Sequence, residues 1–554
     1  MNKWARLIFL FAFFLNGMIA ITKAQSGQWT WMKGDSTYGN TDQTFNSYGV
    51  KDVPDSANTP PKVYAPMSWI GKDRLLYLLG GGAVGNPQFG WQSNDAFMSY
   101  DINTNTWTWV GGNSWLGATV IYGTKGSGDN LTYPGGRYGS CTWVDNDGNF
   151  WLFGGTFSSV YYAPVNDLWK YDIQTKIWTW VSGTNLINDV GTYGMKGVPD
   201  TANAPSSRFL ADNWIDKEGN LWLFGGWHGS DGPNGQYLND LWKYDIKTNQ
   251  WTWMNGSSQI DQPGIYGIKG IADSLNTPGA RENNQLHWVD SIGNFYLYGG
   301  NTLYPKVIMF NDLWKYTSIT NEWTWIGGSD IWGDEGIYTD HCAPGNTASA
   351  REQATGWVDK NGIFWFFAGD ALSKGGVSIT NELWKYNPYN NTWSWLDGSY
   401  DFYHYHYGKQ GISSPENYPH TRFGCTIWYD SSSNNVWMFG GTGNYHLLDD
   451  QTLNDLWKYV PDTACDVATG NMGPIEFVQV SIYPNPATDQ LHIEALNIHN
   501  ATVTILNLFG QVVLKQQFSD NGSIDISFLP KGMYLINIRD ERGNVLQKGK
   551  VVKE

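Results

Sequence analysis

Five arginines occupy one position of a repeated phrase and are the first candidates for chemistry. The phrase runs from Arg through Trp and Asp to Gly-Gly, as in RFLADNWIDKEGNLWLFGG at 208–226. The residues are Arg137, Arg208, Arg281, Arg351 and Arg422, and a degraded first copy has Lys62. A ring of guanidinium groups suits a carboxylate sugar or an acidic peptide. The alternative is structural: each Arg braces an acidic or carbonyl group of the next unit, since interior Arg is seldom unpaired.

Aromatic side chains outside the repeats form a second set of candidates. They are Trp227 with the neighbouring His228, and Tyr403 and Tyr405 in the segment SYDFYHYHY at 399–407. Exposed aromatic rings on one face stack on sugar rings or anchor a protein. The alternative is that these loops pack on their own side chains. We therefore treat the four residues as candidate ligand contacts.

Motifs for metal or catalytic chemistry are weak in this chain. His404 and His406 would share one face of an extended segment, which suits a metal, but the sequence offers no third ligand beside them. No nucleophile elbow, HExxH motif or phosphate loop occurs. The sequence predicts no catalytic residue and no cofactor, and it leans away from an enzyme without deciding the question.

The four cysteines are Cys141, Cys342, Cys425 and Cys465. No two of them form a CxxC motif, and their spacing matches no zinc site. In an exported protein they could form disulfides in three different pairings, and the sequence does not choose among these. Cys141 and Cys425 lie in alternating apolar runs, which favours buried free thiols.

Short strands must position these residues. A second phrase, NDLWKYDIKTNQWTWMNG at 239–256, follows each copy of the first. A Gly-Asn turn divides the first phrase into two runs, and a Thr-Asn turn divides the second. Each unit therefore reads as four strands, a to d, with short a–b and c–d turns and long b–c and d–a connections. Nothing sustains a helical period, so we expect almost no helix.

The repeat has a nearly fixed period, and the units at its two ends are incomplete. The first Trp of successive Trp-x-Trp motifs recurs every 70 to 78 residues. A period of four-stranded units is typical of a β-propeller, and Gly-Gly ends count six units. The last unit stops after NDLWKYVPD at 454–462, while an orphan Trp29-Thr30-Trp31 lies near the N-terminus. We predict that the N-terminal strand completes the last blade, which removes two exposed sheet edges.

The pattern resembles a known family. Gly-Gly, then a Tyr, then a Trp seven residues later is the kelch pattern, seen at Tyr171/Trp178, Tyr244/Trp251 and in three further copies. Residues from about 28 to 465 are similar to a six-bladed kelch propeller of the group that includes the galactose oxidase central domain. The resemblance implies that strand a is innermost, that the long loops share one face with the arginines at the channel mouth, and that the Trp-x-Trp motifs are inter-blade core.

The C-terminal part has a different composition. Trp disappears, and short alternating strands such as VQVSIYPNP predict a small Ig-like β-sandwich. Val480–Pro486, Leu529–Tyr534 and a Lys-rich last strand closely resemble the type A sorting domain of the type IX secretion system. The resemblance implies a Gram-negative bacterium, the type IX machinery as a partner, and a secreted or outer-membrane-surface protein.

The N-terminus predicts export as well. Lys3 and Arg6 precede a short apolar run, and Ala24 followed by Gln25 suits signal cleavage. We expect a signal peptide at 1–24, a propeller at 25–466, a linker at 467–475 and a sorting domain at 476–554. No later run suits a membrane span, and the net charge of −16 argues against nucleic acid.

These features favour a secreted or surface-displayed binding module whose long-loop face recognises an unknown extracellular glycan or protein. The first alternative is a carbohydrate-active enzyme, since the six-bladed kelch proteins that this chain resembles include a sialic-acid epimerase and their group includes copper oxidases. The second alternative is a structural cell-surface component. The ligand, anchoring or release, and the oligomeric state are open at this stage.

Overall fold

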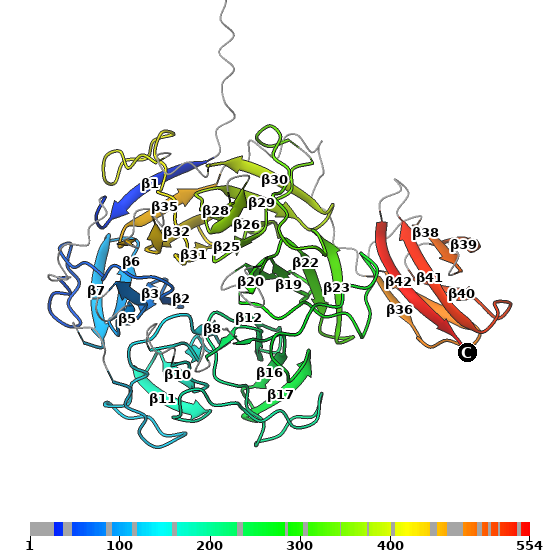
Figure 1. Cartoon of the computed structure of the whole chain (residues 1–554), viewed down its shortest axis with the longest axis horizontal. Coiled ribbons are helices and arrows are strands. Elements are labelled where there is room, and N and C mark those ends of the chain that lie inside the picture. The colour runs from blue at the N-terminus through cyan, green and yellow to red at the C-terminus, as the bar shows by residue number, and fades with distance from the viewer. Residues whose placement is uncertain are drawn as a thin grey trace, which may run out of the picture.

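The chain folds into a large β-propeller followed by a smaller two-sheet unit, seen side by side in Figure 1. This computed structural model describes residues 27–554 with internal gaps, and the described part contains no helix. The gaps are 37–46, 85–90, 114–118, 158–162, 230–235, 283–285, 303–307, 344, 374–375, 400–404, 444–450, 462–479, 496–500, 508–510, 519–520 and 540–544.

Six four-stranded antiparallel sheets, or blades, lie between residues 28 and 460 of the described chain. Blades 1 to 3 are β2 (Met67–Ile70), β3 (Leu76–Leu79), β6 (Phe97–Asp101), β7 (Thr106–Gly111); β8 (Cys141–Val144), β9 (Phe150–Phe153), β10 (Leu168–Asp172), β11 (Ile177–Ser182); and β12 (Asp212–Ile215), β13 (Leu221–Phe224), β16 (Leu241–Asp245), β17 (Gln250–Asn255). Blades 4 to 6 are β18 (His287–Val289), β19 (Phe295–Tyr298), β22 (Leu313–Thr317), β23 (Glu322–Gly327); β25 (Thr355–Val358), β26 (Phe364–Phe367), β29 (Leu383–Asn387), β30 (Thr392–Asp397); and β31 (Thr426–Asp430), β32 (Asn435–Phe439), β35 (Leu456–Val460), β1 (Gln28–Lys33).

The blades form a closed ring. The first strands of neighbouring blades contact one another in the cycle β2, β8, β12, β18, β25, β31 and back to β2. Strand a is therefore innermost, as the alternation of buried and half-buried residues along it also indicates. Figure 1 shows the six sheets around the common axis.

The N-terminal strand completes the last blade. β1 pairs antiparallel with β35, with Trp29 opposite Tyr459 and Trp31 opposite Trp457. Trp29 is 2% exposed and packs on Phe367 of blade 5 at a ring-centroid distance of 5.0 Å. This confirms the prediction made from the orphan Trp-x-Trp, and it removes the open edge of β35.

The repeated Trp residues fill the spaces between blades. Trp251 of blade 3 packs on Phe153 of blade 2, and Trp107 of blade 1 packs on Phe439 of blade 6, at 5.3 and 5.5 Å between ring centroids. Both tryptophans are 1% exposed. The expectation that Trp-x-Trp supplies inter-blade core is confirmed for its first ring, and the burial of such large aromatic surfaces is a main source of stability.

Each long d–a insertion packs against the outer strand of the blade that follows it and forms hydrogen bonds with that strand. Before blade 3, Lys196 donates to the Gly256 carbonyl at 2.7 Å, and its ammonium lies 4.4 Å from the centroid of the Trp253 ring. The Asn203 amide donates to the Trp251 carbonyl at 3.0 Å. Asn58, Asn276 and Asn417 repeat this bond in other blades. The insertions therefore cover exposed strand edges.

The b–c connections extend the blades beyond the main sheets. The b–c connection of blade 5 pairs with β24 (Arg351–Glu352), which lies just before strand a of that blade. The short strands of the b–c connections are β4 (Gly82–Val84), β5 (Trp91–Ser93), β14 (Trp227–His228), β15 (Gln236–Tyr237), β20 (Asn301–Thr302), β21 (Ile308–Met309), β27 (Asp370–Ser373), β28 (Gly376–Ile379), β33 (Thr442–Gly443) and β34 (Gln451–Thr452). Because they begin directly after the Gly-Gly positions, they place their first residues beside the entry to strand a.

The C-terminal unit consists of two sheets around one apolar core. The first contains β36 (Val480–Tyr483), β37 (Gln490–Ala495) and β40 (Asn521–Asp525); the second contains β39 (Val512–Phe518), β38 (Ala501–Leu506), β41 (Gly532–Arg539) and β42 (Val545–Lys553). Leu491, Val503, Ile526 and Ile538 are 0% exposed between them. Alternating residues produce this sandwich because successive side chains of a strand point to opposite faces.

Candidate functional site

The five repeated arginines are buried ion-pair partners. Each is 0% or 1% exposed and binds the acidic residue that precedes strand c of its own blade. The pairs are Arg137–Asp167, Arg208–Asp240, Arg281–Asp312, Arg351–Glu382 and Arg422–Asp455, with N to O distances of 2.6 to 2.8 Å. The guanidinium groups are bound in ion pairs inside the blades, which favours the structural alternative over an anion site. The sequence interpretation placed the partner of each arginine in the next blade. The structure places it in the same blade as the arginine.

Blade 3 shows the complete unit. Arg208 binds both oxygens of Asp240 and also donates to the Gly225 carbonyl at 2.9 Å. The Tyr193 hydroxyl and the Trp242 indole N–H donate to Oδ2 of the same carboxylate at 2.7 and 2.6 Å. Since every oxygen of the buried acid has partners, the charge is fully compensated. In the equivalent pair of blade 6, burial alone would raise the pKa of Asp455, but Arg422 holds that pKa below its usual range.

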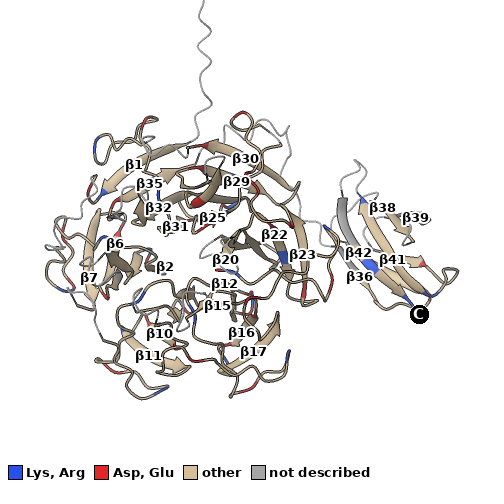
Figure 2. Ribbon diagram, in the orientation of Figure 1, with Lys and Arg blue, Asp and Glu red and all other residues tan. Residues whose placement is uncertain are grey.

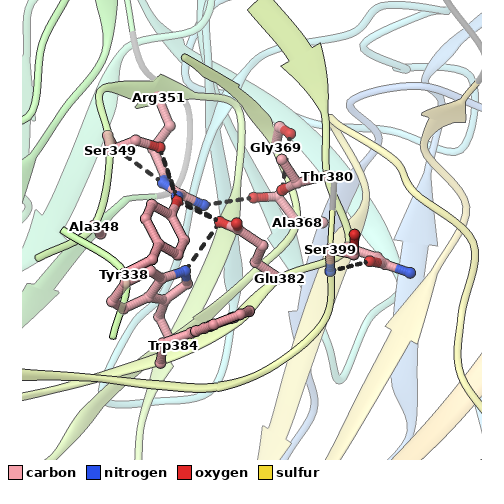
Figure 3. Close-up of polar contacts among 12 residues, drawn as sticks. Tyr338, Ala348, Ser349, Arg351, Ala368, Gly369, Thr380, Glu382, Trp384 and Ser399 are labelled. Atoms are coloured by element: carbon pink, nitrogen blue, oxygen red, sulfur yellow. Dashed lines mark hydrogen bonds and ion pairs between the residues drawn. The ribbon is translucent and has the colours of Figure 1, made fainter. Parts of the chain in front are cut away.

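Blade 5 carries the one Glu among these pairs, drawn in Figure 3. Arg351 Nη2 binds Oε2 of Glu382 at 2.8 Å, and the Tyr338 hydroxyl and Trp384 indole N–H donate to the same oxygen at 3.1 and 3.0 Å. Arg351 also donates to the Ala368 carbonyl at 3.4 Å. The longer side chain thus replaces a two-oxygen fork by a single shared oxygen.

Blade 1 lacks the arginine. Val63 stands at its position, because the Val63 carbonyl accepts from Gly441 N at 2.9 Å just as the Arg208 carbonyl accepts from Gly155 N. The assignment of Lys62 to the ring was therefore wrong by one residue: Lys62 forms a half-exposed pair with Asp35 at 3.2 Å. Asp95 is left with Asn113 as its donor, and burial raises its pKa to about 6.

A second ring of side chains lies one residue after the first. We call it the mouth ring: Tyr64, Tyr138, Phe209, Glu282, Glu352 and Phe423. Each of these residues pairs with the residue that follows Gly-Gly in its own blade, as Phe209 does with Trp227 and Glu282 with Asn301. The repeat therefore fixes the backbone of the mouth ring but leaves its side chains free to differ.

The backbone turns inward directly after the mouth ring. Ala65, Gly139, Leu210, Gln353 and Gly424 all have positive φ, between 45° and 67°. Leu210 N donates to the Gly139 carbonyl, Gly139 N to Ala65, Ala65 N to Gly424 and Gly424 N to Gln353, at 2.7 to 3.0 Å. This chain of bonds links five blades around the axis. It holds the mouth ring as a rigid collar, since left-handed residues persist only where their surroundings determine them.

Four members of the mouth ring form a continuous aromatic arc. Tyr64 lies 5.6 Å from Phe423 and 5.8 Å from Tyr138, and Tyr138 lies 6.0 Å from Phe209, between ring centroids. Phe209 continues to Trp227 at 4.8 Å. These rings are 4% to 9% exposed.

The remaining members, Glu282 and Glu352, form a buried acid pair. Both are 9% exposed, and the amide of Asn301, itself 3% exposed, bonds to Glu352 and also interacts with Glu282. Burial raises the pKa of Glu352 to about 7, and burial together with Glu352 raises the pKa of Glu282 well above its usual range. Two adjacent carboxyl groups in a dry site cannot both ionise easily, which is the physical reason that both pKa values are raised.

The two halves of the mouth ring meet at Tyr64. Its hydroxyl donates to Gln353 Oε1 at 2.5 Å, and its ring lies where a side chain at Gly424 would be. Burial and then Glu282 raise the pKa of Tyr64. The ring thus presents aromatic carbon over four blades and carboxyl and amide groups over two.

The sequence-predicted loop residues have mixed outcomes. Trp227 joins the aromatic arc, and His228 is 7% exposed with its ring nitrogen 2.6 Å from the Ser207 carbonyl. Burial lowers the pKa of His228. Tyr405 is 42% exposed and lies 4.1 Å from the His420 ring. Tyr403 and the weak metal candidate His404 lie outside the described residues, as do Ala24 and Gln25. His406 is exposed and pairs with Tyr418, and the described residues hold no group of three metal-ligating side chains.

A cavity of about 290 Å³ lies along the axis between β31, β2 and β8. Trp69, Trp143 and Trp428 line it together with their neighbours in each strand. It belongs to the middle and far part of the channel, beyond the collar described above. Deeper in the strand a layer, the His287 ring nitrogen lies 2.8 Å from Asp212 Oδ1.

The cysteines separate into two kinds. Cys141 and Cys425 are buried free thiols, as their apolar runs predict, and burial raises the pKa of Cys425 to about 12. Cys342 is disulfide-bonded, and Cys465 lies outside the described residues. The free thiols are therefore unreactive core residues.

Sequence reasoning missed the mouth ring. It concentrated on the repeated Arg, whereas the informative position is the next one: RY, RF, RE, RE and RF in blades 2 to 6. The change from aromatic residues to Glu282 and Glu352 at a fixed place in the repeat is the signal that could have found it.

Two family models match the chain. The secretion system C-terminal sorting domain covers residues 481–553, and a kelch motif covers residues 218–252, which include β13, β16 and the start of β17. The propeller is thus of the kelch type, as its sequence pattern predicted. The sorting domain marks a protein exported by the type IX secretion system to the medium or the outer-membrane surface. No helix in the described part of the chain is long and apolar enough to cross a membrane.

Similar proteins are distant. The chain is 27% identical over 134 residues to an endo-acting ulvan lyase of Formosa agariphila, covering 23% of this chain and 25% of that protein. The match thus spans a quarter of the length of the curated relative. A fungal alcohol oxidase of the AA5 family, in complex with copper, is 14% identical with a TM-score of 0.40, covering 89% of this chain and 98% of that one. A likeness at this score carries no argument about chemistry.

Proposed function

We propose that this protein is an exported glycan-binding module and that its binding site is the mouth ring. The observation that carries the proposal is the divided lining of that ring: aromatic in Phe423, Tyr64, Tyr138 and Phe209, and polar in Glu282 and Glu352. A sugar ring has an apolar face and a polar rim, so a site of this kind matches both.

The rest of the molecule supports a site in this place rather than elsewhere. The repeated arginines are bound to their own blades, and the Trp-x-Trp motifs are core. The d–a insertions are hydrogen-bonded to the outer strands of the blades. The acidic and basic residues are interspersed around the propeller (Figure 2). The mouth ring is where the repeat permits differences and where backbone hydrogen bonds link five blades, which are properties of a binding site on a scaffold.

Glycan binding by the exported protein tests the proposal. Wild type is compared on an immobilised glycan panel with Tyr138→Leu, which removes one ring of the arc, and with Lys62→Ala as a matched control outside it. We expect wild type and the control to bind alike and Tyr138→Leu to bind about tenfold more weakly. Binding of no glycan, or equal binding by all three proteins, contradicts the proposal.

The acid pair favours one second candidate, a carbohydrate-active enzyme. Two adjacent carboxyl groups with raised pKa values, that of Glu352 to about 7, are the usual groups for general acid–base catalysis on sugars. This candidate predicts turnover of a glycan that Glu352→Gln abolishes while binding persists. Incubation of the exported protein with each bound glycan, followed by product analysis, separates it from simple binding.

A further inference from the structure

We propose that the mouth ring is selective for an ammonium group carried on an apolar ring, that is, for an amino sugar whose nitrogen is not acetylated. This inference rests on the proposed glycan site and names its ligand class. Its parts are the acid pair Glu282 and Glu352, the buried amide of Asn301 and the aromatic arc that faces them.

The acid pair has no cation of its own in the described part of the chain. The neighbouring guanidinium groups are already bound: Arg281 to Asp312 and Arg351 to Glu382. Both carboxyl groups are more than nine-tenths buried, and their interactions are with each other, with Asn301 and with Gln353. A buried carboxylate without a cation is costly, and a bound ammonium group relieves that cost.

Asn301 supplies an independent sign of a missing ligand. Its side chain donates to Glu352 through Nδ2, while its Oδ1 atom is buried and has no hydrogen-bond partner. Buried polar atoms are nearly always hydrogen-bonded, so we expect a ligand to supply a hydrogen-bond donor to this oxygen. An ammonium group has three donors and can reach one carboxylate from each Glu and the Asn301 oxygen together.

The aromatic arc favours a sugar over a lysine side chain. Aromatic faces attract cations, which suits either ligand. Consecutive rings from Phe423 to Trp227 are separated by 4.8 to 6.0 Å between centroids, however, so they form a continuous wall without a slot for a narrow methylene chain. A pyranose ring offers a broad apolar face to such a wall.

Other charged groups around the site agree with this assignment. Asp370 pairs with Glu352 between β27 and β24, and Tyr64 and Tyr138 lie on the aromatic side. The described groups near the pair are thus acidic or neutral, apart from the two arginines already committed to ion pairs. When an ammonium group binds, a protonated carboxyl group of the acid pair ionises: its O–H bond breaks, the electron pair stays on the oxygen and the proton goes to solvent.

The test uses the exported protein with two probes, a glucosamine tetramer and the N-acetylglucosamine tetramer, titrated by calorimetry at pH 6.5. We expect the amine to bind about tenfold or more tightly and to release protons, seen as a dependence of the heat on the ionisation enthalpy of the buffer. Glu282→Gln with Glu352→Gln should bring the preference close to one. The change is close to isosteric, and thermal unfolding verifies that the variant folds.

Each alternative outcome has a definite meaning. Equal binding of the two tetramers overturns the ammonium inference and leaves the proposed glycan site standing. Binding of a lysine-rich peptide without either tetramer overturns both. Tighter binding of the amine without proton release also overturns the inference, and this wild-type measurement does not depend on any variant.

Discussion

Two rings of side chains lie one residue apart in this propeller and differ in how their members are paired and in how much they vary between blades. Arg208 is buried and bound to Asp240, and four other blades repeat that arrangement. Phe209, the next residue, belongs to a ring whose members change from aromatic to acidic between blades 3 and 4. The difference teaches that the residue the repeat keeps is the one that builds the blade, and the residue it varies is the one that we propose for a ligand.

Blade 1 provides a natural variant of the first ring. It has Val63 for the arginine and keeps the acid as Asp95, yet the blade-to-blade bond through the Val63 carbonyl is intact. The ion pair is therefore not required for ring closure. Its absence appears instead in the pKa of Asp95, which burial raises to about 6.

The largest expected effect comes from breaking a pair in the first ring. Arg208→Met leaves Asp240 buried without its cation, so the free energy of unfolding should fall by about 3–5 kcal/mol. Denaturant unfolding measures the loss. Combining Arg208→Met with Asp240→Leu should restore most of it, because no unpaired charge then remains. A single variant that loses less than about 1 kcal/mol would show that the pair is not a brace.

The same comparison predicts the opposite pattern one residue further. Phe209→Leu should cost at most about 1.5 kcal/mol of stability, since both side chains are apolar. Its glycan affinity should nevertheless fall several-fold because a ring of the arc is lost, by about 0.5–1.5 kcal/mol of stacking energy. Parallel unfolding and binding measurements on Phe209→Leu and Arg208→Met test whether stability and binding separate. Equal losses of both in the two variants would contradict the division of roles.

The exception in blade 1 predicts a pH effect. The pKa of Asp95 in the folded protein, about 6, is above its ordinary value, so the folded state holds the proton more tightly than the unfolded state. This contribution to stability is present at pH 4 and is lost as the pH rises through 6. Asp95→Asn should remove that part of the slope and raise stability at pH 8 by about 1 kcal/mol. Unfolding curves from pH 4 to 8 measure it, and an unchanged slope argues against it.

The smallest effect is expected for Lys62. Its pair with Asp35 is exposed, with side-chain exposures of 26% and 55%, and exposed pairs contribute little. Lys62→Ala should change the free energy of unfolding by less than about 0.5 kcal/mol. A loss approaching that of Arg208→Met would mean that Lys62 does replace the missing arginine of blade 1.

The sequence by itself determined the fold. Repeats such as Asn239–Gly256, their period and the orphan Trp29 to Trp31 specify four-stranded blades and the strand that closes the ring, because local strand and turn preferences agree with the repeat at every copy. The sequence also identified the buried thiols and the sorting domain, whose signals are local.

Only the tertiary structure decided where the side chains of the candidate site meet. Arg208 and Asp240 are 32 positions apart, and nothing local indicates that they form a pair within one blade. Glu282 and Glu352 come from the neighbouring blades 4 and 5, and it is the packing of these two blades that places their carboxyl groups together in a dry environment and shifts their pKa values. Contacts between distant segments depend on how blades pack around the axis, which residue patterns within one repeat do not contain.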